Sequence, residues 1–295
     1  MSAVPPETRA TGLGIAAVCL WSTLAVLTRT ASGVPPLELT ALSFGIAALL
    51  YLAKWLVTGV DPRAVLAVPP PRAWALGVGG LFGFHLLYFI ALRLAPAVQA
   101  NLVNYLWPLL IVLFAASGDR LRATHVLGAL AGLAGLVVLV GGGGAGFDPN
   151  YLLGYAVAFA AAVVWAGYSV LSRRFAEIPS DAVGGFCAVT AALALLCHLG
   201  LEPTRWPSGF GWWAVLGLGL GPVGAAFFLW DIGVKRGNIR VLGAAAYLAP
   251  LLSTLLLIGF GHAHLSVDVA LAGLLIVGGA VLGSYELWRE SPGTR

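Results

Sequence analysis

The sequence predicts an all-α integral membrane protein whose ten transmembrane helices form two inverted five-helix repeats. Of the 295 residues, 60% are hydrophobic and only 9% are charged, and the mean hydropathy is +0.94. So few charges cannot cover the surface of a soluble domain. The segment Tyr105-Leu-Trp-Pro108-Leu-Leu returns 142 residues later as Tyr247-Leu-Ala-Pro250-Leu-Leu. Because each repeat has an odd number of crossings, the second copy must insert upside down.

Ten apolar stretches, each close to the roughly 20 residues that a helix needs to cross the hydrocarbon core, define the expected crossings. They are residues 12–31, 38–57, 73–92, 97–117, 124–142, 152–172, 182–200, 210–232, 240–259 and 266–287. The repeats are expected at 1–145 and 146–295, joined by the glycine-rich stretch Gly141–Gly146. The loops are too short for an extramembrane domain, so the protein must act within the bilayer.

The distribution of Lys and Arg predicts the orientation. Three of these 16 residues, Arg29, Arg93 and Arg205, fall on one side, and the other 13 share the side of the N-terminus. Positive charge is retained on the cytoplasmic side, so both termini are expected in the cytoplasm and the protein in a bacterial inner membrane. These charges also account for the pI near 9.1, so no nucleic-acid partner is expected.

We expect no metal site, no cofactor and no catalytic centre. Cys19, Cys187 and Cys197 lie within apolar stretches and form no C-x-x-C pair. His262 and His264 supply two metal ligands without a third nearby. An intramembrane enzyme, the alternative from another class, would need a deep Ser/His dyad or two deep aspartates, and no such pair is found.

The fourth stretch holds the most informative polar residues. At about 100° per residue, Asn101, Asn104, Tyr105 and Pro108 share one face. Pro108 cannot donate to the carbonyl of Asn104, and carboxamides are costly in lipid unless they find partners. The asparagines therefore either join helices together or line a substrate cavity. Helix breaks at the midplane of both halves favour the cavity.

Other deep polar or aromatic residues are candidates for the same cavity. Tyr247 and Pro250 share a face of the ninth stretch, which lacks the two amides, so the halves are not expected to bind substrate equally. His85 and Tyr88 share a face of the third stretch near mid-membrane. His85 is either a functional group that handles protons or a neutral imidazole bonded to a backbone carbonyl.

Three aromatic residues, Trp21, Trp165 and Tyr168, lie too deep for the interfacial belt. Trp55, Trp206 and Trp288 are assigned to that belt. The deep rings either pack in the core or surround a cavity, where they would stack on an aromatic or bulky apolar group and also attract a cation.

Acidic residues are missing from the centre of every stretch. The closest is Asp231, interpreted as an ion pair with Lys235 and Arg236 at the interface. We therefore expect no single intramembrane acid to be indispensable. Either His85 carries protons, or substrate moves down its own gradient.

The run Leu102-Val-Asn-Tyr-Leu-Trp-Pro108 resembles the hallmark of the YddG-type aromatic amino acid exporters. The whole chain resembles a ten-helix member of the drug/metabolite transporter superfamily with two EamA-type repeats. The matching positions of the first repeat are Pro108, Gly118-Asp119, Gly128, Gly132 and Gly135. The second repeat has Pro250 and Gly273 but departs from the pattern at the acidic position, which reads Gly261-His262.

The resemblance implies export of aromatic or other bulky neutral amino acids from the cytoplasm; the alternative is a multidrug exporter of organic cations. We expect alternating access around a central cavity, with Pro108 and Pro250 as hinges. The expected substrate-binding residues are Trp21, His85, Tyr88, Asn101, Asn104, Tyr105, Trp165, Tyr168 and Tyr247. One chain holds both halves, so a monomer in the lipid bilayer should suffice, and the G-x-x-x-G motifs are interpreted as internal packing.

Overall fold

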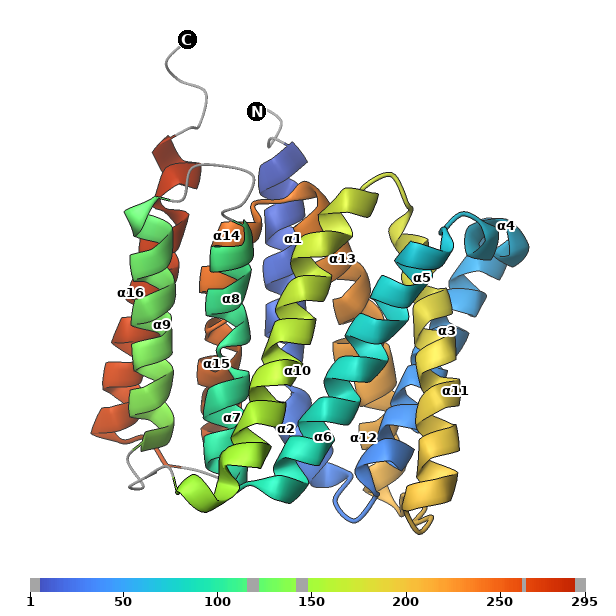
Figure 1. Ribbon diagram of the computed structural model, residues 1–295, viewed down its shortest axis with the longest axis horizontal. Coiled ribbons are helices and arrows are strands. Elements are labelled where there is room, and N and C mark those ends of the chain that lie inside the picture. Colours follow the sequence, from blue (N-terminus) through green and yellow to red (C-terminus); the bar gives the residue numbers. More distant parts are fainter. Residues whose placement is uncertain (1–5, 116–121, 142–147, 262–263, 290–295) are drawn as a thin grey trace.

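The computed structural model describes residues 6–115, 122–141, 148–261 and 264–289, and all regular structure in these ranges is helical. Figure 1 shows long helices side by side, with α1 beginning and α16 ending on the same face of the bundle. The predicted landmarks Gly118-Asp119 and His262 lie outside the described residues.

Among the described residues, five long helices are continuous, and five further helical rods are interrupted. The continuous ones are α3 (Pro36–Thr58), α9 (Ala123–Gly141), α10 (Leu152–Leu171), α11 (Val183–Leu201) and α16 (Val267–Arg289). The interrupted rods are α1 (Pro6–Trp21) with α2 (Leu24–Thr30), α5 (Pro71–Val78) with α6 (Phe84–Leu94), α7 (Ala97–Asn104) with α8 (Trp107–Phe114), α12 (Phe210–Leu218) with α13 (Ala226–Arg236), and α14 (Ile239–Ala245) with α15 (Leu248–Gly259). The connections hold the short α4 (Pro62–Ala67) and 3₁₀ turns at Pro149–Tyr151, Ser172–Phe175 and Ser180–Ala182.

Within the described residues, eight helical stretches are long and apolar enough to cross a membrane. Two further apolar segments, Ala123–Leu139 and Val267–Gly283, are shorter. An all-helical, multi-pass membrane protein is thus confirmed.

The sequence predicted helix breaks near Pro108 and Pro250 in the fourth and ninth stretches, and the structure confirms them. The backbone turns at Tyr105–Leu106, between α7 and α8, and at Ala246–Tyr247, between α14 and α15. The reason is the proline that follows each turn, because Pro108 and Pro250 cannot donate the next helical hydrogen bond. The chain instead tightens, with Leu106 N bonded to Val103 O at 3.1 Å.

A further break, which the sequence did not predict, separates α1 from α2 at Ser22 and Thr23. The hydroxyl of Ser22 donates to the carbonyl of Cys19 at 2.6 Å, and that of Thr23 donates to the carbonyl of Leu20 at 2.7 Å. Such bonds back to the preceding turn compete with the helical ladder and bend it. The equivalent helix of the second half, α10, runs without a break.

Two wide π-helical turns lie at matching places in the two halves. One spans Gly79–Gly83 between α5 and α6, and the other spans Gly219–Ala225 between α12 and α13. A π turn holds one residue more than an α turn and is found mostly at functional sites. Pro222 lies inside the second π turn and removes a backbone donor there.

Contacts between the halves follow a two-fold pattern. Helix α1 packs along α13, as α10 packs along α6. The pairs α3–α11 and α9–α16 each join equivalent helices. Exchanging the two halves therefore leaves this set of contacts unchanged.

Glycine permits the closest of these approaches, between α9 and α16. A Cβ on Gly128 would lie 2.6 Å from the carbonyl oxygen of Gly279, and one on Gly279 would lie 2.5 Å from the carbonyl oxygen of Gly128. Only residues without a side chain allow backbones to meet in this way. The motifs of α9 and α16 thus serve internal packing, as predicted. Gly79 meets no atom within 4 Å and is part of the π turn instead.

Two carboxylates, on half-buried Asp181 and on the buried side chain of Glu202, join the ends of α3 and α11. Asp181 accepts from Lys54 Nζ at 2.6 Å and from Trp55 Nε1 at 3.0 Å. At the other end, Glu202 accepts from the backbone N–H of Leu37 at 3.0 Å. Trp55, which was assigned to the interfacial belt, is only 4% exposed, so its ring faces protein at the start of α11 and not the molecular surface.

Of the other two belt residues, Trp206 is exposed, as expected of a belt residue. The side chain of Trp288 lies outside the part of the chain that is described.

Candidate functional site

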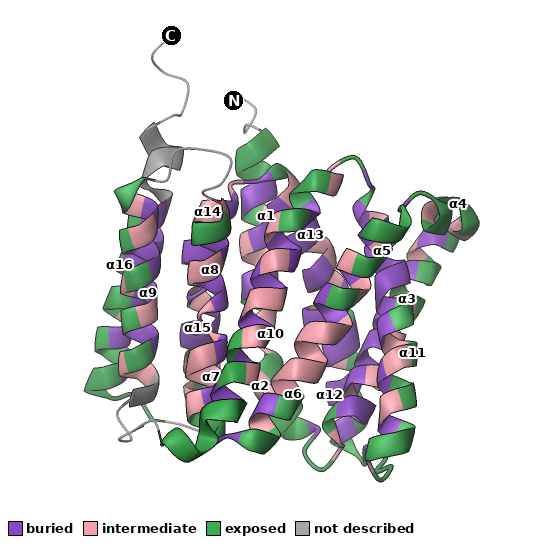
Figure 2. Ribbon diagram, in the orientation of Figure 1, coloured by how far each residue is buried: buried purple, intermediate pink, exposed green. Residues whose placement is uncertain are grey.

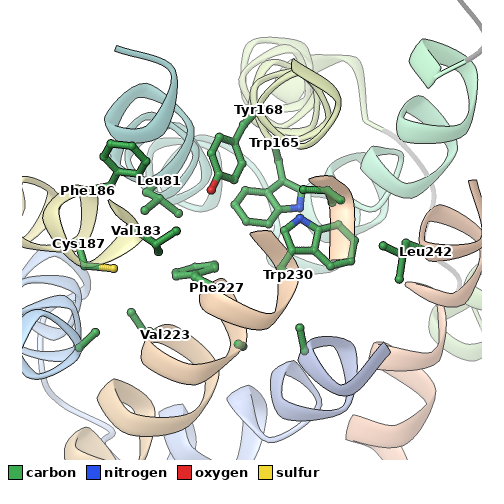
Figure 3. Packing of buried hydrophobic residues seen from close by; sticks show 14 of the residues in the cluster. Leu81, Trp165, Tyr168, Val183, Phe186, Cys187, Val223, Phe227, Trp230 and Leu242 are labelled. Carbon is green, nitrogen blue, oxygen red and sulfur yellow. The ribbon is translucent and has the colours of Figure 1, made fainter. Parts of the chain in front are cut away.

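Four tryptophans from four helices meet in the middle of the bundle. They are Trp21 of α1, Trp107 of α8, Trp165 of α10 and Trp230 of α13, and we call them the tryptophan cluster. All six pairs of rings are in contact, with centroids 5.0–6.4 Å apart. Figure 3 shows Trp165 and Trp230 with their indole rings side by side. Each half of the chain contributes two of the four rings.

Two of the four indole groups are fixed by hydrogen bonds. Trp21 Nε1 donates to the carbonyl of Pro222 in the π turn at 2.9 Å, and Trp230 Nε1 donates to Ser169 Oγ at 3.1 Å. The N–H groups of Trp107 and Trp165 make no hydrogen bond to the described residues. These two donors are therefore available to a ligand.

Phenylalanine and tyrosine rings extend the aromatic surface. The ring centroids of Phe84 and Tyr168 lie 5.3 Å and 5.4 Å from that of Trp165. Phe227 lies 5.7 Å from Trp165 and stacks on Phe44, with the centroids 5.6 Å apart. A surface of this kind suits a flat apolar group, and the faces of its rings attract positive charge.

His85 adds a polar group to this surface. Its Nδ1 lies 2.7 Å from the carbonyl oxygen of Leu81, and because that oxygen can only accept, Nδ1 must carry the proton. In the neutral ring, Nε2 is then left as an acceptor. The ring meets Phe44 and Phe84 edge-on at 5.1 Å and 5.2 Å. The bond to a backbone carbonyl is the one expected for the neutral imidazole, whereas a proton-carrying role stays a prediction.

Tyr88 and Asn101 form a second polar group nearby. The Tyr88 hydroxyl donates to Asn101 Oδ1 and so links α6 to α7. The Tyr88 ring stacks on Phe84 with an interplanar angle of 3°. Both Tyr88 and Asn101 are half-buried, so the amide N–H₂ of Asn101 remains able to donate.

Three of the predicted site residues lie elsewhere. Asn104 is buried, and its Oδ1 has no hydrogen-bond partner among the described residues. Tyr247 is fully buried and packs against Gly132, where a Cβ would lie 2.5 Å from its ring. Tyr105 packs on the same group of side chains. That group consists of Val112, Ala129, Leu136, Tyr247, Leu251 and Ile276.

The structure thus brings together five of the nine predicted residues, Trp21, His85, Tyr88, Trp165 and Tyr168, and adds Asn101 through Tyr88.

Sequence reasoning missed half of the tryptophan cluster. Trp107 lies inside the repeated signature, and Trp230 lies 142 residues after Tyr88, at the equivalent place in the second half. The same offset relates His85 to Phe227. Carrying each candidate across the repeat would have found Trp230 and Phe227.

No group of three or more His, Cys, Asp or Glu in the described part of the chain could hold a metal ion.

These features define a helical membrane protein with a repeated unit and an aromatic centre shared by both copies. The chain belongs to the EamA-like transporter family, whose model matches it twice, over residues 8–141 and 152–285.

Its relatives are named more specifically. The aromatic amino acid exporter YddG of Ancylobacter novellus is 55% identical over 279 residues, which cover 93% of this chain and 96% of that protein. The aromatic amino acid exporter YddG of Escherichia coli K12 is 28% identical over 296 residues, which cover 93% of this chain and 96% of that protein. A crystal structure of a protein 53% identical to this chain superposes with a TM-score of 0.92, covering 97% of this chain and 99% of that one.

Proposed function

We propose that this protein exports aromatic or other bulky neutral amino acids from the cytoplasm across the bacterial inner membrane. The observation that carries the proposal is the tryptophan cluster, which is shared by both halves and adjoins the polar groups of His85, Tyr88 and Asn101. The high identity to a relative named for aromatic amino acid export supports the substrate class.

The proposed topology has ten crossings, with inverted repeats at 1–145 and 146–295 and both termini in the cytoplasm. The two-fold contact pattern and the bias of Lys and Arg support it. Helices α9 and α16 serve as the fifth and tenth crossings. Their 19 and 23 residues correspond to lengths of about 28 Å and 34 Å at 1.5 Å per residue, close to the thickness of the hydrocarbon core.

Transport follows alternating access, with one chain sufficient for function. Turns without regular hydrogen bonds absorb backbone changes most readily, so the breaks before Pro108 and Pro250 act as hinges. The two π turns, which directly follow α5 and α12, offer a second place to bend. Substrate rings stack on the tryptophan cluster while His85 and Asn101 supply an acceptor and a donor.

The alternative substrate is an organic cation, which ring faces would attract as well. His85 Nε2, the amide of Asn101 and two free indole N–H groups favour a solute that both donates and accepts hydrogen bonds. That description fits an amino acid better than a methyl viologen-like cation.

The experiment is uptake by proteoliposomes of labelled tryptophan, phenylalanine, alanine and methyl viologen, with and without a pH gradient. We expect saturable uptake of the aromatic amino acids, weak uptake of alanine and none of methyl viologen. Uptake of methyl viologen alone would replace the proposal by cation export. Uptake that ignores the pH gradient would indicate facilitated movement, and stimulation by the gradient would indicate proton coupling.

A further inference from the structure

A small cavity lies beside the aromatic centre, among α5, α10, α11 and α13. Its wall includes Gly77, Tyr168, Phe186 and two charged residues, Asp231 and Lys235. Its volume is about 20 Å³, which is room for a water molecule but not for an amino acid. In this conformation the cavity is therefore closed to substrate.

Asp231 and Lys235 form a buried ion pair in this wall. Lys235 Nζ lies 2.8 Å from Asp231 Oδ2, and the side chains are only 6% and 2% exposed. The sequence predicted this ion pair, and the structure confirms it with Lys235. The structure also shows that α5, the end of α10 and α11 cover the pair, which the sequence did not predict. Removing two charges from water is costly, so such a pair inside a membrane protein marks a functional site by default.

Both charged groups keep unused hydrogen-bonding capacity. The ammonium of Lys235 has three donors, of which one faces Asp231 and a second donates to the carbonyl of Ile178 at 3.0 Å. Asp231 Oδ2 lies at ion-pair distance from the lysine but accepts no hydrogen bond from the described residues. A donor of Lys235 and acceptor capacity of Asp231 thus remain in the wall of the same cavity.

We propose that Asp231 and Lys235 form a subsite for the zwitterionic backbone of the substrate on the cytoplasmic side of the tryptophan cluster. Asp231 binds the α-ammonium group and Lys235 binds the α-carboxylate. An ammonium and a carboxylate on one carbon match a cation and an anion held four residues apart on one helix turn. Binding exchanges one ion pair for two, so neither buried charge loses its partner. This inference rests on the proposed export of amino acids.

Tyr168 connects this subsite to the aromatic centre. Its ring lies in the cavity wall and also 5.4 Å from the ring of Trp165. Figure 3 shows Tyr168 between Trp165 and the side where Leu81 and Phe186 lie. A substrate held by its backbone at Asp231 and Lys235 can therefore direct an aromatic side chain toward the tryptophan cluster.

The α5 side of the cavity packs bare backbone directly against rings. A Cβ on Gly77 would lie 2.4 Å from the ring of Phe186, and one on Gly80 would lie 2.5 Å from the ring of Tyr168. Gly77 lies two residues before the π turn that begins at Gly79, and Gly80 lies within it. In the proposed subsite, displacement of α5 at this turn would open the cavity between α5 and the ion pair.

The test compares phenylalanine with two analogues that each lack one charge: 2-phenylethylamine has no carboxylate and 3-phenylpropionate has no ammonium. Each analogue competes with labelled phenylalanine in proteoliposomes. For the wild type we expect both to compete at least tenfold more weakly than phenylalanine. Asp231→Asn should weaken the binding of phenylalanine about tenfold but leave the binding of 3-phenylpropionate nearly unchanged. Lys235→Met should also weaken the binding of phenylalanine about tenfold, but it should leave the binding of 2-phenylethylamine nearly unchanged.

The control is Lys54→Met, which breaks the 2.6 Å ion pair with Asp181 at the end of α3 and should leave the analogue ratios as in the wild type. If the neutral variants do not give a monodisperse protein, the conservative Asp231→Glu and Lys235→Arg should keep the preference for the zwitterion. Equal losses for phenylalanine and both analogues would show that the pair only locks helices, and would overturn this inference. A wild type that carries no aromatic amino acid would instead overturn the proposed function, and this inference with it.

Discussion

The two halves of this protein share one plan but differ in how much of their surface is enclosed. In an apolar 18-residue window of each candidate span, 22–33% of the residues are buried in the four spans of the first half and 50–56% in the four of the second half. Figure 2 shows the burial of each residue along the helices. Equivalent positions follow the same trend, because half-buried His85 and Tyr88 correspond to buried Phe227 and Trp230.

The difference indicates a division of labour. The second half supplies a tightly packed aromatic frame, and the first half presents accessible polar groups against it. A duplicated unit can therefore keep a symmetric framework while the half-buried polar groups beside its rings, His85, Tyr88 and Asn101, lie in one copy. The predictions below test this division, beginning with the largest effect.

Removing a ring from the shared centre should have the greatest consequence. Trp165 contacts the three other tryptophans, and Trp165→Ala should lower the uptake of labelled phenylalanine about tenfold or more, the equivalent of roughly 1.4 kcal/mol of lost stacking. The matched control is Trp213→Ala, at a ring that is 69% exposed. Equal uptake by both variants would remove the tryptophan cluster from the transport site.

Exchanging equivalent residues separates the roles of the halves. His85→Phe should lower transport several-fold while the protein stays folded, because only a polar group is lost. Phe227→His should instead lower the thermal stability, because it places an imidazole without a designed partner in a buried site at a cost of about 1–3 kcal/mol. Melting in detergent and uptake are measured for both. If the two variants behave alike, the halves are not specialised.

A milder pair tests the fourth and ninth stretches. Asn101→Ala removes the acceptor of the Tyr88 hydroxyl and should reduce uptake a few-fold without loss of expression. Its equivalent, Gly243→Ala, adds a Cβ at 2.8 Å from Val112 and 3.0 Å from the carbonyl of Pro108, so it should lower the melting temperature. Wild-type uptake by Asn101→Ala would remove that residue from the site.

The smallest effect on transport is expected at the contact between α9 and α16. Gly279→Ala should destabilise the protein by about 1–3 kcal/mol, because its Cβ would lie 2.5 Å from a carbonyl oxygen. Gly278→Ala meets no atom within 4 Å and should be neutral or slightly stabilising. Equal melting temperatures for these neighbours would show that close approach does not hold the halves together here.

Hydropathy and internal repetition predict the helical fold and the repeated signature, because lipid imposes apolar runs of one length on every crossing. They do not reveal which side of a helix faces protein. Lipid and a packed interior are equally apolar, so Trp55 was assigned to the interfacial belt although it donates to Asp181.

The breaks in the helices could be predicted only in part. Pro108 and Pro250 mark two of them. The break at Ser22–Thr23 depends on hydroxyl groups that are compatible with an unbroken helix as well. The first π turn carries only clustered glycines as a signal, and the second carries glycines with Pro222. Likewise, Asp231 was read from its distance to the helix end, while its burial depends on α5, α10 and α11, which approach only in three dimensions.

The extra residue in the π turn at Gly79–Gly83 sets the rotation of α6 about its own axis, and so the direction in which its side chains point. Deleting one residue there would restore ordinary helical winding and rotate α6 by about 100°. His85 and Tyr88 would then point away from Phe227 and Asn101, although no residue of the pocket wall had been altered. The orientation of His85 and Tyr88 at the centre of this protein thus depends on one additional residue in the π turn before α6.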